Sequence, residues 1–83
     1  MDELIIYGTV WCGDCRRTRG FLDRNQIVYK WINIDADRDG EAYVYQVNHG
    51  NRSVPTIAFP DGSVLVEPSN DQMAQKLGLA ILN

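Results

Sequence analysis

The sequence predicts an α/β fold, a four-stranded mixed sheet with helices on both faces, formed by residues 1–83 as a single domain. Three observations predict this fold. Two apolar runs flank a stretch with helical spacing, which is the pattern of a β-α-β unit of about 30 residues. An acidic stretch, residues 35–39, then precedes a second helical segment. Finally, the turn Pro60-Asp61-Gly62 joins two short strand-like runs as a hairpin, before a last helix.

The expected order of elements is β-α-β-α-β-β-α. We expect strands at residues 4–7, 27–34, 54–59 and 63–67, and helices at 13–25, 38–48 and about 70–77. A right-handed crossover makes the first two strands parallel. Ser69 and Gln72 have the spacing of a capping box, and we expect Gly50 and Gly78 to end the second and third helices. We expect the apolar residues 79–82 to pack onto the rest of the fold.

Helical spacing also predicts which side chains each helix buries. The expected inward positions are Cys15, Thr18, Phe21 or Leu22, and Asn25 in the first helix; Ala42, Tyr43 or Tyr45, Gln46 and Val47 in the second; Met73 and Leu77 in the third. The four arginines of the first helix are either a solvated face or a means of attracting anionic thiol substrates.

Two cysteines, Cys12 and Cys15, stand where the first strand gives way to the first helix. The first amide N–H groups of a helix lack intrahelical partners, and the peptide dipoles place partial positive charge at that end. A sulfur held there is stabilised as thiolate, which is the nucleophilic form. We therefore expect Cys12 to attack a disulfide and Cys15 to resolve the mixed intermediate. Asp14 opposes thiolate formation, while Arg16 and Arg17 act against Asp14.

Other interpretations of these motifs are weaker. Half of a zinc site would need two more ligands, and only His49 remains to supply one, so we assign no metal ligands and no catalytic role to His49. An inert structural cysteine pair stays open as an alternative. Residues 35–40 match the first half of an EF-hand loop, but the position of the bidentate glutamate is Gln46, and a strand-like segment precedes the loop.

Composition excludes several classes of protein. The net charge of −3 disfavours a nucleic-acid binder. Both cysteines lie in one motif, unlike those of a secreted disulfide scaffold. The acidic start and four-residue apolar run do not fit a signal peptide, and no apolar run approaches a membrane span of about 18 residues. We therefore expect a cytoplasmic protein with no membrane or nucleic-acid partner.

The motifs Trp11–Cys15 and Ser53-Val54-Pro55, in this order of elements, resemble the glutaredoxin branch of the thioredoxin fold over nearly the whole chain. The resemblance implies that Pro55 is cis and packs near Cys12. It also implies that Val54 offers its backbone N–H and C=O groups to the cysteinyl part of a bound thiol peptide.

By the same resemblance, the ends of that ligand meet Arg52 on one side and Asn70 and Asp71 on the other. Trp11 is either a core residue or a partly exposed platform beside the site.

The chain departs from typical glutaredoxins at three places: it has Gly13-Asp14 between the cysteines instead of Pro-aromatic, Thr9 instead of lysine, and Glu67-Pro68 instead of a double glycine. We expect Cys12 to be less acidic than in a Pro-aromatic motif. The pattern Tyr-x-Thr-x-Trp-Cys-Gly-x-Cys, with Gly-Asn-Arg-x-Val-Pro-Thr later, is most similar to mycoredoxins, which act on mycothiol mixed disulfides.

The resemblance thus implies a monomeric thiol-disulfide oxidoreductase that binds no cofactor. It would use mycothiol or glutathione as co-substrate and disulfide-containing proteins as partners. One alternative is a redoxin that donates electrons to ribonucleotide reductase and is itself reduced by thioredoxin reductase. Another is a binder in which Cys12 from two chains holds an iron–sulfur cluster.

Overall fold

The computed structural model describes residues 3–79, and over these residues the elements follow the predicted order. They are β1 (Leu4–Gly8), α1 (Gly13–Arg24), β2 (Tyr29–Asn33), α2 (Arg38–Val47), β3 (Thr56–Ala58), β4 (Val64–Val66) and α3 (Asn70–Leu77). Of the apolar tail expected to pack onto the fold, residues 80–82 lie outside the described residues. None of the helices within residues 3–79 is both long and apolar enough to cross a membrane.

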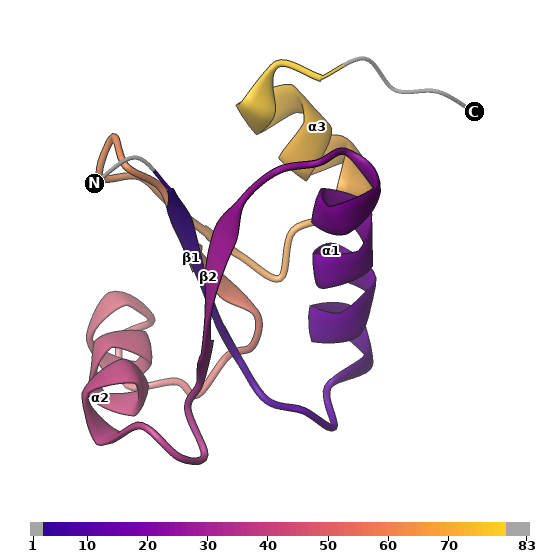
Figure 1. The fold of residues 1–83 in the computed structure, drawn as a ribbon. Helices are drawn as coiled ribbons and strands as arrows, with labels where there is room; N and C mark the ends of the chain where they lie inside the picture. The colour runs from indigo at the N-terminus through magenta and orange to yellow at the C-terminus, as the bar shows by residue number, and fades with distance from the viewer. Residues whose placement is uncertain (1–2, 80–83) are drawn as a thin grey trace.

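The sheet is mixed, as predicted, and its strand order is β2-β1-β3-β4. Figure 1 shows β1 and β2 side by side. β1 runs parallel to β2 and antiparallel to β3, and β4 pairs antiparallel with β3 through the predicted hairpin. β1 is therefore central, and its carboxyl end leads into the two-cysteine motif.

The helices cover both faces of the sheet: α1 and α3 lie on one side and α2 lies on the other (Figure 1). Alternation along β1 separates the two cores, because successive side chains point to opposite faces. Leu4 and Ile6 pack with Leu22 of α1 and Met73 of α3. Tyr7 packs instead with Val44 of α2. Full burial of each such aliphatic side chain contributes about 1.5–3 kcal/mol, so both helical layers are held mainly by these contacts.

The second strand begins later than predicted. Pairing with β1 starts at Tyr29, and Val28 is exposed. The reason lies at the end of α1, where the amide of Ile27 still donates to the carbonyl of Leu22 at 2.9 Å and so belongs to the turn. Asn25, expected to face inward, is exposed at the C-cap of α1.

The predicted buried face of α2 is partly wrong. Ala42 and Gln46 are exposed, whereas Gly40, Val44 and Asn48 are buried. Gly40 sets this face, because a Cβ there would lie 2.7 Å from Cγ2 of Ile32 in the sheet. The helix backbone therefore approaches the sheet at Gly40, and burial follows the i, i+4, i+8 spacing from that point.

The end of α2 also differs from the prediction. Its C-cap is Asn48, and His49 adopts a left-handed conformation with φ of 55°. Gly50 donates its amide to the carbonyl of Tyr45 at 2.7 Å, which is the long bond of a Schellman motif. At α3, by contrast, Gly78 is the left-handed cap, as expected.

Candidate active site

Cys12 occupies the N-cap position of α1. Its backbone is extended, and its Sγ accepts a hydrogen bond from the amide N–H of Cys15 at 3.1 Å. The sulfur thus takes the place that a serine or aspartate oxygen has in an ordinary N-cap. The amide donor and the positive end of the helix dipole therefore both lie at this sulfur. The predicted placement of the Cys12 sulfur at a helix start is confirmed.

The two cysteines differ in environment, although both are free thiols. Cys12 keeps 9% of its surface exposed, whereas Cys15 keeps 1%. Burial, followed by a side-chain hydrogen bond with Cys12, raises the pKa of Cys15 to about 12, and the negative charge of Asp14 adds to this. A backbone hydrogen bond from Thr9 acts in the opposite direction on that pKa but is outweighed. Cys15 is therefore a neutral thiol at pH 7.

Gly8 makes room for the buried sulfur. A Cβ on Gly8 would lie 2.6 Å from the Sγ of Cys15 and 2.9 Å from the ring of Trp31. A side chain at the end of β1 would therefore displace the Cys15 sulfur or the Trp31 indole. This role of Gly8 has no local sequence signal, because the two residues that a Cβ would meet lie 7 and 23 positions further along the chain.

The loop before β3 lies against the Cys12 sulfur. The Val54–Pro55 bond is cis, as the resemblance implied, and the carbonyl oxygen of Val54 lies 3.9 Å from the Sγ of Cys12. Pro55 is buried, and its carbonyl accepts from the amide of Glu67 at 2.8 Å. Thr56 then donates its hydroxyl to the carbonyl of Ser53 at 2.7 Å, which fixes the loop from its other end.

Trp11 and Arg52 are joined by a residue that the sequence analysis did not single out as a site residue, Asp35. Trp11 is 64% exposed, so its indole is a surface group beside the site, and it donates through Nε1 to Oδ2 of Asp35 at 3.0 Å. Arg52 donates to Oδ1 of the same carboxylate and, through Nε, to Oε2 of Glu41 at 2.8 Å. The hydrogen bond from Arg52, followed by that from Trp11, holds the pKa of Asp35 below its usual value.

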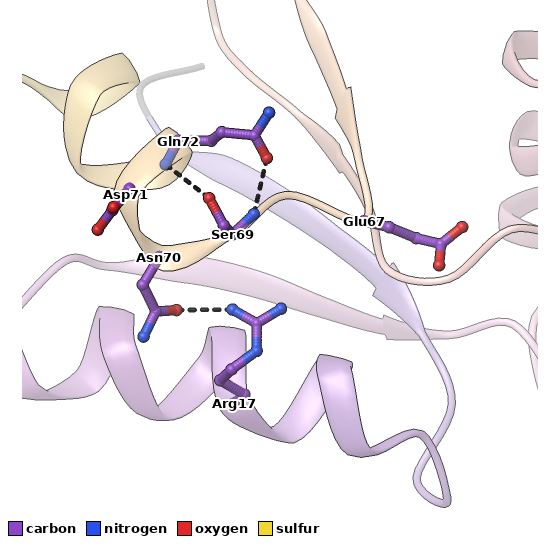
Figure 2. Close-up of a pocket in the computed structure, with 6 residues that line it drawn as sticks. All are labelled: Arg17, Glu67, Ser69, Asn70, Asp71 and Gln72. Atoms are coloured by element: carbon purple, nitrogen blue, oxygen red, sulfur yellow. Dashed lines mark hydrogen bonds between the residues drawn. The ribbon is translucent and has the colours of Figure 1, made fainter.

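On the opposite side, the start of α3 is tied to α1 by Arg17. Arg17 donates through Nη1 to Oδ1 of Asn70 at 2.7 Å (Figure 2). It also donates through Nη2 to the carbonyl of Pro68 at 3.1 Å. Its guanidinium also lies 3.7 Å from the carboxylate of Asp14, within the cysteine motif. This connects the α3 side of the site to the motif through one side chain.

An open pocket of about 470 Å³ lies at the start of α3 (Figure 2). The predicted capping box is present, with the Ser69 hydroxyl accepting from the Gln72 amide at 3.1 Å and the Gln72 side chain accepting from the Ser69 amide at 2.8 Å. The pocket is lined by Arg17, Glu67, Ser69, Asn70, Asp71 and Gln72. The two α3 residues expected to meet a ligand therefore both line an accessible hollow.

The arginines of α1 are not one uniform solvated face. Arg16 and Arg24 are exposed, as that interpretation expected. Arg17 instead bridges to α3, and Arg19 stacks on the Trp31 ring at 4.1 Å from its centroid. Two of the four cations thus have structural partners that lie far along the sequence.

The EF-hand-like stretch has structural roles instead. Asp37 is the N-cap of α2 and accepts from the Gly40 amide at 2.8 Å, while Asp35 binds Trp11 and Arg52. Over residues 3–79, no group of three or more His, Cys, Asp or Glu side chains is placed to hold a metal ion.

The arrangement therefore places the Cys12 sulfur at a helix start, on a residue that keeps 9% of its surface exposed, with the buried Cys15 thiol and the Val54 carbonyl oxygen beside it. Trp11 and Arg52 lie together through Asp35, and Asn70 and Asp71 line the α3 pocket. Such a site can exchange a disulfide at one sulfur.

Comparisons with known proteins extend over most of the chain. The glutaredoxin family model matches residues 4–64. The protein named "Putative glutaredoxin Rv3198A" from Mycobacterium tuberculosis is 46% identical over 74 residues, covering 89% of this chain and 88% of that protein. Mycoredoxin 1 from Corynebacterium glutamicum is 35% identical over 77 residues, covering 93% and 95%. The crystal structure of a glutaredoxin from Archaeoglobus fulgidus has a TM-score of 0.74 at 25% identity, covering 93% and 87%.

Proposed function

Because the chain belongs to the glutaredoxin family and is a thiol-disulfide oxidoreductase, we propose that it reduces mixed disulfides between proteins and a low-molecular-weight thiol, with Cys12 as the attacking sulfur. The observation that supports this most strongly is the position of the Cys12 Sγ at the N-cap of α1, 3.1 Å from the amide nitrogen of Cys15. The greater exposure of Cys12 than of Cys15 also supports it.

The proposed reaction has two exchange steps. The Cys12 thiolate attacks the small thiol's sulfur in the mixed disulfide, and the old S–S bond breaks. The target protein leaves as a thiolate and takes up a proton, and the small thiol stays bonded to Cys12. A second small-thiol thiolate then attacks that bound sulfur, which releases the Cys12 thiolate and a small-thiol disulfide. The two electrons come from the pair of small thiols.

Cys15 offers a second way to release the captured thiol, by attacking Cys12 and closing a Cys12–Cys15 disulfide. Its raised pKa of about 12 and its 1% exposure disfavour this route at neutral pH, because the thiolate is the attacking form. We therefore propose release by a second small thiol as the main route, with Cys15 as a slower alternative.

We propose mycothiol as the preferred thiol. The similarity to Mycoredoxin 1, over 95% of that protein, supports this choice. The presence of Gly13-Asp14 between the two cysteines, in place of a Pro-aromatic pair, also supports it. The cysteinyl part of the thiol would lie against the backbone of Val54, next to Pro55. One end would meet Trp11 and Arg52, and the other would meet Asn70 and Asp71.

We also propose a cytoplasmic location, since a reducing compartment keeps both cysteines of the motif as thiols.

The test is reduction of one reporter peptide carried as a mixed disulfide with mycothiol or with glutathione, with the matching free thiol as reductant. We expect Cys12→Ser to abolish turnover and Cys15→Ser to retain it, and we expect mycothiol to be the faster substrate. Undiminished turnover in Cys12→Ser would overturn the proposal. Turnover with thioredoxin reductase and NADPH, but with neither small thiol, would favour the redoxin alternative instead.

A further inference from the structure

The proposed thiol site has a cation at one end, and that cation is already paired. Arg52 donates to Oδ1 of Asp35 and to Oε2 of Glu41, so two carboxylates share one guanidinium. The arginine side chain is only 30% exposed, and the two acidic side chains are 41% and 35% exposed. The local charge of this group of three residues is therefore −1 when all are ionised.

Asp35 also binds Trp11, the exposed residue at the same end of the site. Its second oxygen, Oδ2, accepts the indole N–H of Trp11 at 3.0 Å, and Trp11 directly precedes Cys12. The Asp35 carboxylate thus binds two groups of the site. One is the exposed indole of Trp11, next to Cys12, and the other is the guanidinium of Arg52, in the loop before Val54. The partners come from three separate segments, so only the folded chain brings them together.

These contacts decide which chemistry the Arg52 end accepts. A ligand carboxylate that approached Arg52 would compete with two protein carboxylates and would meet their negative charge. A neutral hydroxyl or amide group would not meet this repulsion. It could still accept from the remaining N–H groups of the guanidinium and could donate to either carboxylate.

We infer that Asp35 and Glu41 are specificity-determining residues: by pairing with Arg52, they make this end of the site favour thiols whose far end is neutral and polar over thiols that end in a carboxylate. The inference rests on the proposed function and extends it, because it assigns the discrimination to two residues that do not touch the reacting sulfurs. Mycothiol, a neutral sugar-linked cysteine derivative, fits this preference, whereas glutathione carries two carboxylates.

The test compares two thiols that differ in one group only: glutathione and its analogue with a carboxamide in place of the glycine carboxylate. Each is presented as a mixed disulfide with the same reporter peptide, with one reductant in both assays. We expect the unmodified protein to favour the carboxamide by about three- to fivefold in kcat/KM, which is the upper part of the range expected for partly exposed charge pairs. The difference should lie in KM, because Asp35 and Glu41 act on binding of a remote group.

Three variants separate the local effect from net charge. Asp35→Asn and Glu41→Gln should each lower KM for the carboxylate substrate and shrink the preference below about twofold, with kcat unchanged. Asp39→Asn removes the same charge from an exposed aspartate that has no ion pair or side-chain hydrogen bond within residues 3–79, and it should keep the preference. Glu41→Gln leaves the Trp11–Asp35 contact intact, so it tests the charge without moving the indole.

The outcomes distinguish this inference from the proposed function. If the unmodified protein reduces neither mixed disulfide, nor that of mycothiol, the proposed function fails. If it reduces both at equal kcat/KM, or if its preference is unchanged in Asp35→Asn and Glu41→Gln, the proposed function stands and this inference is overturned. An equal response of Asp39→Asn would also overturn it, since net charge would then explain the effect.

Discussion

Replacement of Gly8 by alanine tests how tightly the buried Cys15 sulfur is packed. The new Cβ would lie 2.6 Å from the Cys15 Sγ and 2.9 Å from the Trp31 ring, well inside ordinary van der Waals contact. Overpacking of this kind costs about 1–3 kcal/mol, because buried neighbours cannot move freely. Because both new contacts are shorter than 3.0 Å, we expect a cost in the upper half of that range, about 2–3 kcal/mol. Alanine regains about 0.5–1 kcal/mol over glycine in a strand, so the expected net loss of stability is about 1–2.5 kcal/mol.

Urea unfolding of the reduced protein measures this loss. Gly13→Ala is the matched control, because a Cβ at Gly13 meets nothing within 4 Å at the first residue of α1. We expect that control to be neutral or up to about 1 kcal/mol more stable, as alanine is the better helix former. A Gly8→Ala protein within about 0.5 kcal/mol of the unmodified protein would refute the packing argument.

A double-mutant cycle assigns the loss to its source. Removing the sulfur with Cys15→Ala removes the shortest contact and leaves the Trp31 contact at 2.9 Å, so Gly8→Ala should cost less in that background. The expected coupling is about 0.5–1.5 kcal/mol, the range for residues in contact. Additive effects would show that the new Cβ does not meet the sulfur.

The remaining predictions concern pH, backbone strain and capping. Folding raises the pKa of Cys15 to about 12, so the contribution of its neutral thiol to stability is full below the unfolded-state pKa of about 8.5 and is lost as pH rises toward 12. The urea midpoint of the unmodified protein should therefore fall more steeply above pH 9 than that of Cys15→Ser, and parallel curves would contradict this. Glu67 has a left-handed φ of 49°, which glycine adopts more easily than other residues. Glu67→Gly should therefore stabilise the protein by up to about 1 kcal/mol in thermal unfolding, whereas Glu67→Ala should not. An equal gain in both variants would show that removal of the negative charge, and not backbone strain, causes the effect. Ser69→Ala removes one half of the α3 capping box and should cost about 1 kcal/mol, with faster hydrogen exchange in the first turn of α3, whereas exposed Gln75→Ala should change stability by less than about 0.5 kcal/mol.

Features that depend on a few neighbouring residues could be predicted from the sequence. The Ser69 capping box, the turn Pro60-Asp61-Gly62 and the sulfur of Cys12 at the start of α1 each need only residues within about one helical turn or one hairpin. The apolar runs likewise predicted the four strands and their order along the chain, although pairing begins only at Tyr29 in β2.

Features that depend on the approach of distant segments could not be predicted in this way. At Gly8 a side chain would overlap Cys15 and Trp31. At Gly40 a side chain would overlap Ile32 of the sheet, so the buried face of α2 follows from this close approach and not from hydrophobic spacing alone. The partners of Asp35 lie 24 and 17 residues away, and those of Arg17 lie 51 and 53 residues away. The residues next to such a charged side chain in the sequence do not show whether it binds a distant partner or is solvated.

The different roles proposed for the two cysteines follow from the geometry of one capped helix turn. The N-cap residue lies outside the helix, and Cys12 keeps 9% of its surface exposed. The third helical residue, Cys15, faces the sheet, where Gly8 leaves space for its sulfur. The hydrogen bond to the Cys12 sulfur comes from the main chain of Cys15 and not from its thiol. A serine at Cys15 therefore keeps this donor, which is why we expect the first exchange step to survive that change, whereas a serine at Cys12 removes the attacking sulfur itself.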